Sequence, residues 1–476
     1  MRHARRQRAH RGLVAIILTH AALALAACGH DAAFVRGPAV AAPVPDTDVD
    51  HRLLLIGDAG HPDPEGEPVL RALAQRVLEL PDRTTVLFLG DNVYETGMPD
   101  DSALSGTVIA EVLDEALLNL YESRRDAERR LGAQMEVVRG SAARAIFVPG
   151  NHDWDQLGVG GWERVLAQGA YLRQADRDPS LDVAMLPEGG CPGPVGVELG
   201  ATGRLVVLDT QWFLDPAIGG KPAPGENPTG CAHVTADGAM AGLRTELEAA
   251  RAEGRVAIVA GHHPLLSRGP HGGHFAWHVH LFPLIMLGSY VPSFVHWIPL
   301  PAVGSFMVGV RACCSPNAQD LPSAANRALR TLLLDTLESA RIAGAPALLY
   351  AAGHEHSLQL FLSPRGPRYA VVSGLGSREK ASYVGSLEGT LFADAGPDAT
   401  GYFQVDLMRS GRVRLAVFQV DDEGVGIRES YARDLRTGAG GDGQGDRAVR
   451  TGPDPRPPPA RSATPRDPPA PPPPAR

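Results

Sequence analysis

Five segments of this chain share one design: a short apolar run, then a glycine, then side chains that can bind a metal ion. Short apolar runs of this kind are typical of buried strands. Ligands of open α/β sheets bind just beyond the carboxyl ends of such strands. We therefore expect the five strand ends to converge on one metal centre. The segments are 53–60 (LLLIGDAG), 86–97 (VLFLGDNVYETG), 145–153 (AIFVPGNHD), 256–264 (VAIVAGHHP) and 347–356 (ALLYAAGHEH).

Seven side chains in these segments are candidate metal ligands. Two metal ions about 3.5–4 Å apart can stabilise both the attacking and the leaving oxygen when a phosphoryl group is displaced. Seven donors are enough for two ions if one carboxylate bridges them, and Asp91 is the expected bridge. Taken singly, each residue has a structural alternative, because a Gly-Asp pair usually marks a turn and a lone histidine is usually structural. The candidates are Asp58, Asp91, Tyr94, Asn151, His262, His354 and His356.

Helices and further strands are expected around these segments, and together they would position the candidate ligands. Apolar residues recur at helical spacing in 68–80, and residues 104–140 are expected to be largely helical. The last third of the chain alternates short strands, which suits a second sheet. The sequence thus predicts an α/β domain over residues 51–425. Further helices are expected at 162–174, 237–253 and 325–341, and further strands at 195–198, 204–208, 358–362, 369–372, 402–407 and 413–420.

In order and type, these motifs resemble the calcineurin-like metallophosphoesterases, and most of all the small, mammalian-type purple acid phosphatases. The wider family begins with D-x-H, whereas the purple phosphatases have GDxG, which matches residues 57–60. They also have a tyrosine three residues after the second aspartate, which is the position of Tyr94. The resemblance covers roughly residues 50–425. It implies a four-layer α/β/β/α sandwich of two mixed sheets, with the site at the strand ends between them.

The same resemblance assigns the ligands to two metal ions that share Asp91. A phenolate and carboxylates are hard anionic donors that favour Fe(III), whereas an amide and imidazoles suit a less charged ion. The first ion would be Fe(III), and the second a divalent Fe, Zn or Mn. The first would be bound by Asp58, Tyr94 and His356, and the second by Asn151, His262 and His354.

Two further histidines are candidate catalytic residues by resemblance. His152 would point at the phosphate, where it could stabilise charge or donate a proton. His271 stands nine residues after His262 and is a candidate general acid. The remaining histidines of 262–280 line the phosphate pocket, bind adventitious metal or belong to a Gly/His-rich loop without a specific role.

The expected function is the hydrolysis of phosphate monoesters by a dinuclear metal centre, as in an acid phosphatase. The same site could serve a phosphodiesterase or a nucleotidase, because loops outside the motifs select the substrate. A third alternative is a non-catalytic envelope lipoprotein that binds metal or phosphate. The expected partner is a small phosphate ester, and the net charge of −9 argues against nucleic acid.

The N-terminus has the pattern of a targeting segment. Five arginines precede an apolar stretch at 13–27, which is too short to span a bilayer comfortably. The stretch ends in LAAC, which resembles the lipobox of bacterial lipoproteins and makes Cys28 the lipidated residue. Because Gly29 follows rather than Asp, the anchor would lie in the outer membrane of a Gram-negative cell. The alternative is an ordinary signal peptide that contains a cysteine. We expect a flexible tether over residues 29–50.

The remaining cysteines and two unusual stretches complete the sequence. An exported chain favours disulfides, and the loop-like surroundings of Cys191 and Cys231 favour that pair. Cys313 and Cys314 could form a vicinal disulfide or stay as two thiols. Residues 281–321 form an apolar insertion, interrupted by prolines, that is a lid over the site, a membrane-facing surface or an extra hairpin packed on the core. Residues 437–476 are rich in Gly and Pro, which predicts a disordered tail.

Overall fold

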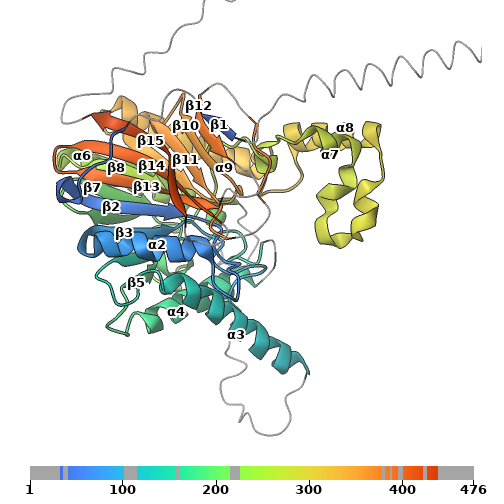
Figure 1. The fold of residues 1–476 in the computed structure, drawn as a ribbon, viewed down its shortest axis with the longest axis horizontal. Helices are drawn as coiled ribbons and strands as arrows, with labels where there is room; N and C mark the ends of the chain where they lie inside the picture. Colours follow the sequence, from blue (N-terminus) through green and yellow to red (C-terminus); the bar gives the residue numbers. More distant parts are fainter. Residues whose placement is uncertain are drawn as a thin grey trace, which may run out of the picture. The chain divides into compact units, whose positions relative to one another are not determined.

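The computed structural model describes residues 33–35, 41–100, 115–156, 158, 160–214, 226–377, 381–385, 389–394, 400–421 and 426–437. The predicted signal peptide with Cys28 lies outside the described residues, as do much of the predicted tether and the tail after Thr437. The strands of the described part form two sheets (Figure 1).

The first sheet has the strand order β15-β14-β13-β2-β3-β4-β5. Neighbouring strands from β2 to β5 are parallel, whereas β13, β14 and β15 are added antiparallel at one side. The strands are β2 (Val49–Ile56), β3 (Thr84–Phe88), β4 (Arg144–Phe147), β5 (Val183–Met185), β13 (Gly401–Met408), β14 (Arg412–Val420) and β15 (Ile427–Thr437).

The second sheet has the order β1-β12-β10-β11-β9-β8-β7-β6. Strands β7, β8, β9 and β11 are parallel, and the others pair antiparallel. Both sheets are therefore mixed, as predicted. The strands are β1 (Ala33–Val35), β6 (Val195–Leu199), β7 (Gly203–Val207), β8 (Val256–Ala260), β9 (Ala347–Ala352), β10 (Leu358–Leu362), β11 (Tyr369–Ser373) and β12 (Thr390–Asp394).

Alternating side chains place each sheet between two apolar layers. On β2, Leu53 and Leu55 face the core between the sheets, and Leu54 and Ile56 face helices. Helices α2 (Pro68–Glu79), α3 (Glu115–Met135) and α4 (Gly161–Ala175) cover the first sheet, and α6 (Ala236–Ala252) and α9 (Ala324–Ile342) cover the second. This order of layers confirms the predicted α/β/β/α sandwich. Shorter helices are α5 (Gln211–Leu214) and the 3₁₀ turns η1 (Asp46–Asp48), η2 (Pro81–Arg83), η3 (Glu188–Gly190) and η4 (Pro270–Gly272).

The predicted boundaries differ from the structure at both ends of the domain. Strand β15 extends the first sheet to Thr437, beyond the expected end at 425. The strand is rich in charged residues and pairs at the sheet edge with β14 alone. Strand β1 lies within the stretch expected to be a tether and pairs with β12. Three residues give no periodic signal, so this pairing was not visible in the sequence.

The apolar insertion is helical and begins before the predicted bound of 281, because α7 (Trp277–Leu281) packs against its other helices; the name refers from here on to residues 271–321. It contains α7, η5 (Pro283–Tyr290), η6 (Ser293–Trp297) and α8 (Pro301–Cys314), which lie against one another (Figure 1, yellow). Within the described residues, no helix combines the length and the apolar character that crossing a membrane requires. The two ends of the insertion meet where the N–H of Leu321 donates to the carbonyl of His271, at 2.7 Å.

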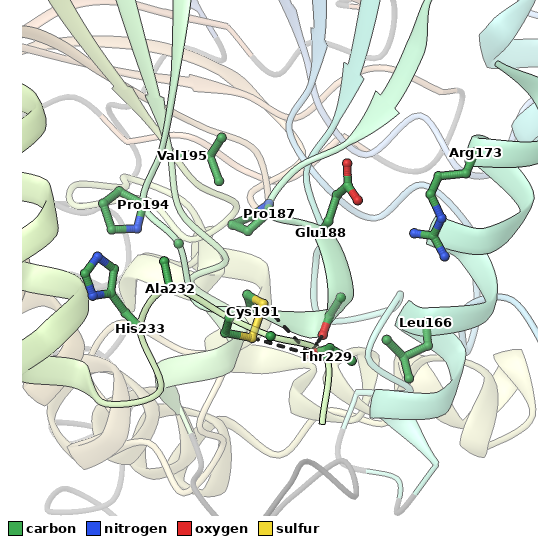
Figure 2. A pocket seen from close by; sticks show the side chains of 14 residues that line it. Leu166, Arg173, Pro187, Glu188, Cys191, Pro194, Val195, Thr229, Ala232 and His233 are labelled. Atoms are coloured by element: carbon green, nitrogen blue, oxygen red, sulfur yellow. Dashed lines mark hydrogen bonds between the residues drawn. A yellow bond between two sulfur atoms is a disulfide. The ribbon is translucent and has the colours of Figure 1, made fainter. Parts of the chain in front are cut away.

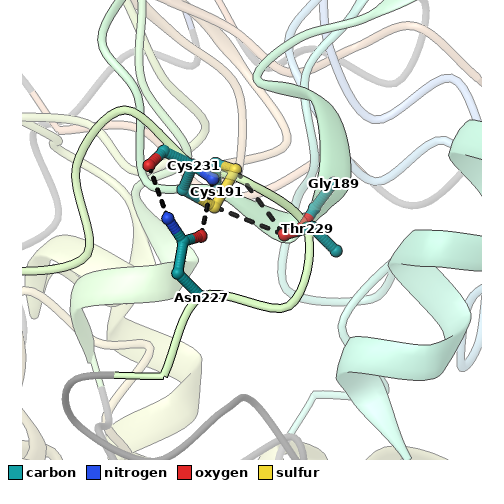
Figure 3. The surroundings of a disulfide bond; sticks show 5 residues. All are labelled: Gly189, Cys191, Asn227, Thr229 and Cys231. Atoms are coloured by element: carbon teal, nitrogen blue, oxygen red, sulfur yellow. Dashed lines mark hydrogen bonds between the residues drawn. A yellow bond between two sulfur atoms is a disulfide. The ribbon is translucent and has the colours of Figure 1, made fainter.

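Both predicted cysteine neighbourhoods contain a disulfide. The favoured bond between Cys191 and Cys231 is confirmed, and Cys313 and Cys314 are joined to each other. Figure 3 shows that Asn227 accepts the N–H of Cys231 and donates to its carbonyl, which fixes the loop at the first bond. A cavity of about 520 Å³ lies beside this bond, lined by Arg173 and Glu188 among others (Figure 2). Its lining includes none of the nine predicted site residues, all of which the structure describes.

Candidate metal centre

The candidate ligands follow strands that end at the same edge. Asp58, Asp91 and Asn151 follow the parallel neighbours β2, β3 and β4. His262 follows β8, and His354 and His356 follow its parallel neighbour β9. Parallel strands present their carboxyl ends together, so two clusters form, one on each sheet, and the sheets bring the clusters into contact. The structure therefore brings together all seven residues.

The first donor group is centred on the phenol of Tyr94. Its hydroxyl oxygen lies 3.0 Å from Asp58 Oδ1, 3.1 Å from His356 Nε2 and 3.3 Å from Asp91 Oδ2. A phenol carries a single hydrogen, which cannot satisfy three such neighbours at once. A cation bound to the ionised phenol would satisfy all of them.

The second donor group is centred on the amide oxygen of Asn151. This oxygen lies 2.9 Å from both His262 Nε2 and His354 Nδ1. The other nitrogen of His262 faces the carbonyl of Leu89 at 2.8 Å, and that of His354 faces the carbonyl of Gln319 at 2.9 Å. A carbonyl only accepts, so each histidine carries its hydrogen on that side. Two imidazole lone pairs therefore point at one amide oxygen, an arrangement that a cation stabilises.

Asp91 joins the two groups through one atom. Its Oδ2 lies near Tyr94 in the first group and 3.4 Å from His262 Nε2 in the second, while its Oδ1 accepts the N–H of His152 at 2.9 Å. Ligand atoms at about 2.0–2.2 Å from one ion stand roughly 3 Å apart. The separations of 2.9–3.4 Å match that spacing. The donor set therefore fits two metal ions with Asp91 between them.

The electrostatics of the cluster favour a positive charge in the same place. Burial lowers the pKa of His262, but the charge of Asp91 and its hydrogen bond outweigh burial and raise that pKa to about 9. Burial likewise raises the pKa of Asp91, but His262 and His152 bring it below its ordinary value. Burial, then the charges of His271 and His263, hold the pKa of His354 well below its usual range. The raised pKa of His262 thus shows that a positive charge is favourable next to Asp91, which is where a metal ion would lie.

Backbone conformation at the site is unusual for residues with side chains. Asp58, Asp91 and His354 have φ values of 58°, 55° and 70°, in the left-handed region that is costly for such residues. Close approach of the loops also requires small residues. A Cβ on Gly150 would lie 2.2 Å from Asp91 Oδ1, so only glycine lets the Asn151 loop reach Asp91. Strain of this kind is concentrated at functional sites.

The two predicted catalytic histidines lie at the rim of the cluster. The ligand candidates Asp58, Asp91 and His262 are at most 2% exposed, whereas the side chains of His152 and His271 are 18% and 27% exposed. His152 donates from Nδ1 to the carbonyl of Glu95 at 2.6 Å, which turns its Nε2 to within 4.0 Å of Asp91 Oδ2. The ring of His271 lies 4.2 Å from that of His354 between centroids. Both can therefore meet a substrate held at the cluster.

His263 lies beside the cluster but is already engaged. Its Nδ1 faces the hydroxyl of Thr210 at 2.9 Å, and its Nε2 faces Gln319 Oε1 at 2.7 Å. Burial, then the charge of His262, lower its pKa to about 3, so it stays neutral. With both ring nitrogens bound, His263 supports the loop that carries His262 rather than binding a metal ion itself.

Sequence reasoning missed Asp153 as part of the site. Its carboxylate accepts the N–H groups of Gly150 at 2.7 Å and of Asn92 and Val93 at 3.1 Å, and so ties the Asn151 loop to the Asp91 loop. Burial, then the charge of Asp91, raise its pKa to about 7, and a cation bound by Asp91 would oppose the second cause. Asp153 stands within the motif GNHD, so the signal was present but had no assigned role.

Glu355 was missed for the same reason, because it stands in the motif GHEH without an assigned role, and Asp320 was missed for a different one. Asp320 lies 2.8 Å from His271 Nδ1 and accepts two hydrogen bonds from Arg311. Although burial raises the pKa of Asp320, Arg311 and His271 lower it below the ordinary value. Glu355 accepts the backbone N–H of His271 at 2.9 Å. Asp320 lies at the end of the long apolar insertion, so its spacing from the motifs contained no information about its place.

Residues 51–283 match the sequence profile of the family described as calcineurin-like phosphoesterase. No protein with a curated description matches the chain. Solved structures that resemble it include "GAP50 the anchor in the inner membrane complex of Plasmodium", with 15% identity, a TM-score of 0.45 and coverage of 81% of this chain and 88% of that one. A dimetal phosphatase from Danio rerio has 14% identity, a TM-score of 0.39 and coverage of 82% and 99%. These two likenesses are too distant to support a conclusion. The stretch that matches the calcineurin-like phosphoesterase profile holds four of the candidate ligands, Asp58, Asp91, Asn151 and His262, so the chain is similar to that family over residues 51–283.

Proposed function

We propose that this protein hydrolyses phosphate monoesters at a pair of metal ions. One observation supports this most directly. The candidate ligands form two groups that share one oxygen, Asp91 Oδ2, and in each group there are too few hydrogens to satisfy all the lone pairs that face one another. When bound, such a pair supplies a hydroxide nucleophile and a positive surface for the phosphate oxygens. The carbonyls of Leu89 and Gln319 orient the ligands His262 and His354, and burial keeps these two side chains away from bulk water.

The metal pair that suits this chain is Fe(III) with a divalent Fe, Zn or Mn, as in a purple acid phosphatase. The group of Tyr94, Asp58 and Asp91 offers hard anionic oxygens, which favour Fe(III). The group of Asn151, His262 and His354 offers a neutral amide and imidazoles, which favour the divalent ion.

Two rim histidines act on the substrate in this proposal. His152 Nε2 faces the space above Asp91 and donates to a phosphate oxygen. His271 donates a proton to the leaving oxygen, and Asp320 holds its ring by accepting from Nδ1. Because Arg311 also binds Asp320, the carboxylate keeps its orientation while His271 changes its protonation state.

The protein works outside the cytoplasm in this proposal, held to a membrane through a lipid on Cys28. The basic N-terminal residues, the apolar stretch at 13–27 and the LAAC sequence support it. Labelling with a radioactive or clickable palmitate should mark the wild-type chain and not Cys28→Ala. Equal labelling of both would remove the lipid anchor.

Hydrolysis is tested with two synthetic esters and a metal analysis of the same preparation. We expect turnover of p-nitrophenyl phosphate well above that of bis-p-nitrophenyl phosphate, and about two metal ions per chain. Faster turnover of the diester would identify a phosphodiesterase. A chain that binds both ions but hydrolyses neither ester, nor a panel of nucleotides, would be a binding protein.

Colour tests the iron assignment separately. A tyrosinate bound to Fe(III) absorbs visible light, so the protein should be purple to pink and Tyr94→Phe should bleach it. Tyr402→Phe is the matched control, because Tyr402 is equally buried but lies in the core under the helices of the first sheet. A colourless, iron-free and active wild-type enzyme would overturn the iron assignment and leave the hydrolase.

A further inference from the structure

The apolar insertion, which lies in the chain between His262 and His354, has an unusual charge pattern. The chain contains no acidic residue between Glu253 and Asp320, although its net charge is −9. Within residues 275–318, Arg311 is the only charged residue other than histidines. A surface without carboxylates is not repelled by anionic lipid headgroups, whereas most of this protein is acidic.

Large apolar side chains are exposed on the same insertion. Phe294 is 76% exposed, Phe306 71% and Trp297 64%, and Val303 and Ile298 are 48% and 44% exposed. On α8, Val303 and Phe306 are three residues apart and share a helix face. We call these five residues the apolar tip. Phe294, Trp297 and Ile298 are close together in the chain, in η6 and at its end, and several exposed apolar side chains in one short segment differ from the single ones that ordinary surfaces have.

The apolar tip is held in a defined shape. The rings of Phe282 and Trp297 are 5.6 Å apart, and the N–H of Leu300 donates to the carbonyl of Leu281 at 2.7 Å. A Cβ on Gly304 would lie 2.3 Å from the carbonyl oxygen of His280, so α7 and α8 are in close contact. The exposure of the tip is therefore built into the fold of the insertion.

The insertion begins and ends at the rim of the candidate metal centre. His271 at its start and Asp320 at its end are 2.8 Å apart between Nδ1 and Oδ1. Arg311, near the end of α8, binds the same carboxylate at 2.7 and 2.9 Å. The apolar tip thus belongs to a segment that leaves the domain at the site edge of the sheets.

The N-terminal strand reaches the domain at the same edge. Ala33 of β1 and Leu358 of β10 both lie opposite Asp394 of β12, so β1 starts beside the start of β10. Strand β10 starts two residues after His356, at the site edge. Ala33 is five residues after Cys28, and five residues span at most about 18 Å. A lipid on Cys28 would therefore hold the bilayer close to the site edge.

We propose that the apolar tip inserts into the interface of a lipid bilayer and that the candidate metal centre faces that bilayer. Phenylalanine and tryptophan side chains are favourable at the depth of the headgroups and upper acyl chains. A lipid on Cys28 attaches the chain to the bilayer at one point, and a second contact would fix how the domain is oriented on the bilayer. The proposal concerns attachment and does not rest on the proposed hydrolysis.

Quenching of tryptophan fluorescence by brominated lipid tests insertion directly. The full chain is reconstituted in vesicles of about three parts phosphatidylethanolamine to one part phosphatidylglycerol, with bromine near the top of the acyl chains. We expect Trp297 to be quenched, and the quenching to fall in Trp297→Phe. Trp162→Phe is the control, because Trp162, a residue of α4, packs against the core under the helices of the first sheet. Unquenched Trp297 would overturn the proposal even if Cys28 is acylated.

Vesicle binding of unlipidated chains supplies a second measurement. In a Cys28→Ala background, the triple variant Phe294→Ser, Trp297→Ser and Phe306→Ser should bind the same vesicles about a thousandfold more weakly, since each of the three buried aromatic rings contributes about tenfold. The control is Leu78→Ser with Ile342→Ser, which removes equally exposed apolar side chains, 67% and 74%, from α2 and α9. The N-terminal apolar stretch is the same in both variants.

Two results would overturn the proposal in this second measurement. Equal binding of the triple variant and the control would show that the apolar tip makes no contact with lipid. A wild-type chain that forms a dimer, lost in the triple variant, without any lipid quenching would assign the tip to a second copy of the chain. Thermal unfolding of each variant checks that the fold is intact, and hydrolysis of a soluble ester should be unchanged in both.

Discussion

Replacing Asp153 with asparagine should weaken both the fold and the candidate metal centre. The carboxylate accepts N–H groups only: those of Asn92 and Val93 on Oδ1, and those of Gly150 and the Asn92 side chain on Oδ2, at 2.7–3.1 Å. An amide can keep one oxygen. If the NH₂ group takes the place of Oδ1, the N–H of Val93 loses its acceptor. If it takes the place of Oδ2, the N–H of Gly150 and the side-chain NH₂ of Asn92 lose theirs.

The expected cost follows from these contacts. Each buried donor left without an acceptor costs about 1–3 kcal/mol, and the remaining bonds lose their charge assistance, so we expect about 3 kcal/mol in total. Supporting hydrogen bonds of metal ligands change affinity about 10–100-fold when removed. Because Asp153 joins the loops of Asp91 and Asn151, the second metal ion should be the one that is weakened.

Denaturant unfolding of the metal-loaded protein and a divalent metal titration, both near pH 8, measure these effects. The matched control is Asp155→Asn, which removes the same charge two residues further on. Asp155 is partly exposed and lies 3.7 Å from Arg164, and asparagine tolerates its φ of 58°. The control should lose less than about 1 kcal/mol. An Asp153→Asn protein with wild-type unfolding midpoint and metal affinity would refute the reasoning.

Three further predictions concern the close approach of the loops, the metal ions and pH. Gly150→Ala should lose metal binding, measured by metal content of the purified protein, because its Cβ would lie 2.2 Å from Asp91 Oδ1; full metal content would contradict the packing argument. Removing metal with a chelator should lower the unfolding temperature, and adding metal again should restore it. When free metal is at a thousand times its dissociation constant, bound metal raises the free energy of unfolding by about 4 kcal/mol, and this is the contribution that the chelator removes. Burial, opposed by Asp50, lowers the pKa of His51 to about 4, so the folded state holds His51 neutral. Stability should therefore fall as pH drops from 6.5 to about 4, by about 3 kcal/mol, and level off below. His51→Gln should remove that part of the acid sensitivity in urea unfolding, and an unchanged pH profile would contradict it.

Local features of the sequence were enough to predict the positions of the candidate ligands. Asp58, Asp91 and Asn151 each follow an apolar run and a glycine, and parallel strands place such positions at one edge. The unbroken apolar run of Leu53 to Ile56 likewise indicates a strand buried on both faces, and the structure places its residues alternately against the other sheet and against helices. These signals are local because strand periodicity and tight turns depend on neighbouring residues.

Other parts of the site depend on residues that meet only in the folded chain. Asp320 binds His271 across 49 positions, and the carbonyl of Gln319 orients His354. Neither residue belongs to a motif, and the length of the insertion before them hides their register. Hydrogen-bond partners across such distances are selected by the packing of whole elements, which no local pattern records.

The sequence, taken with the family resemblance, was enough to predict the two mixed sheets and the five strand ends, and to propose the seven candidate donors. Tertiary structure alone decided that Asp91 Oδ2 belongs to both donor groups, and that the lone pairs of His262 and His354 face Asn151. It also decided that Phe294, Trp297 and Phe306 are exposed rather than buried. The physical reason is that the polarity of a side chain indicates only whether it favours burial or contact with water. Its actual partner and its exposure are decided when distant segments of the chain pack against each other.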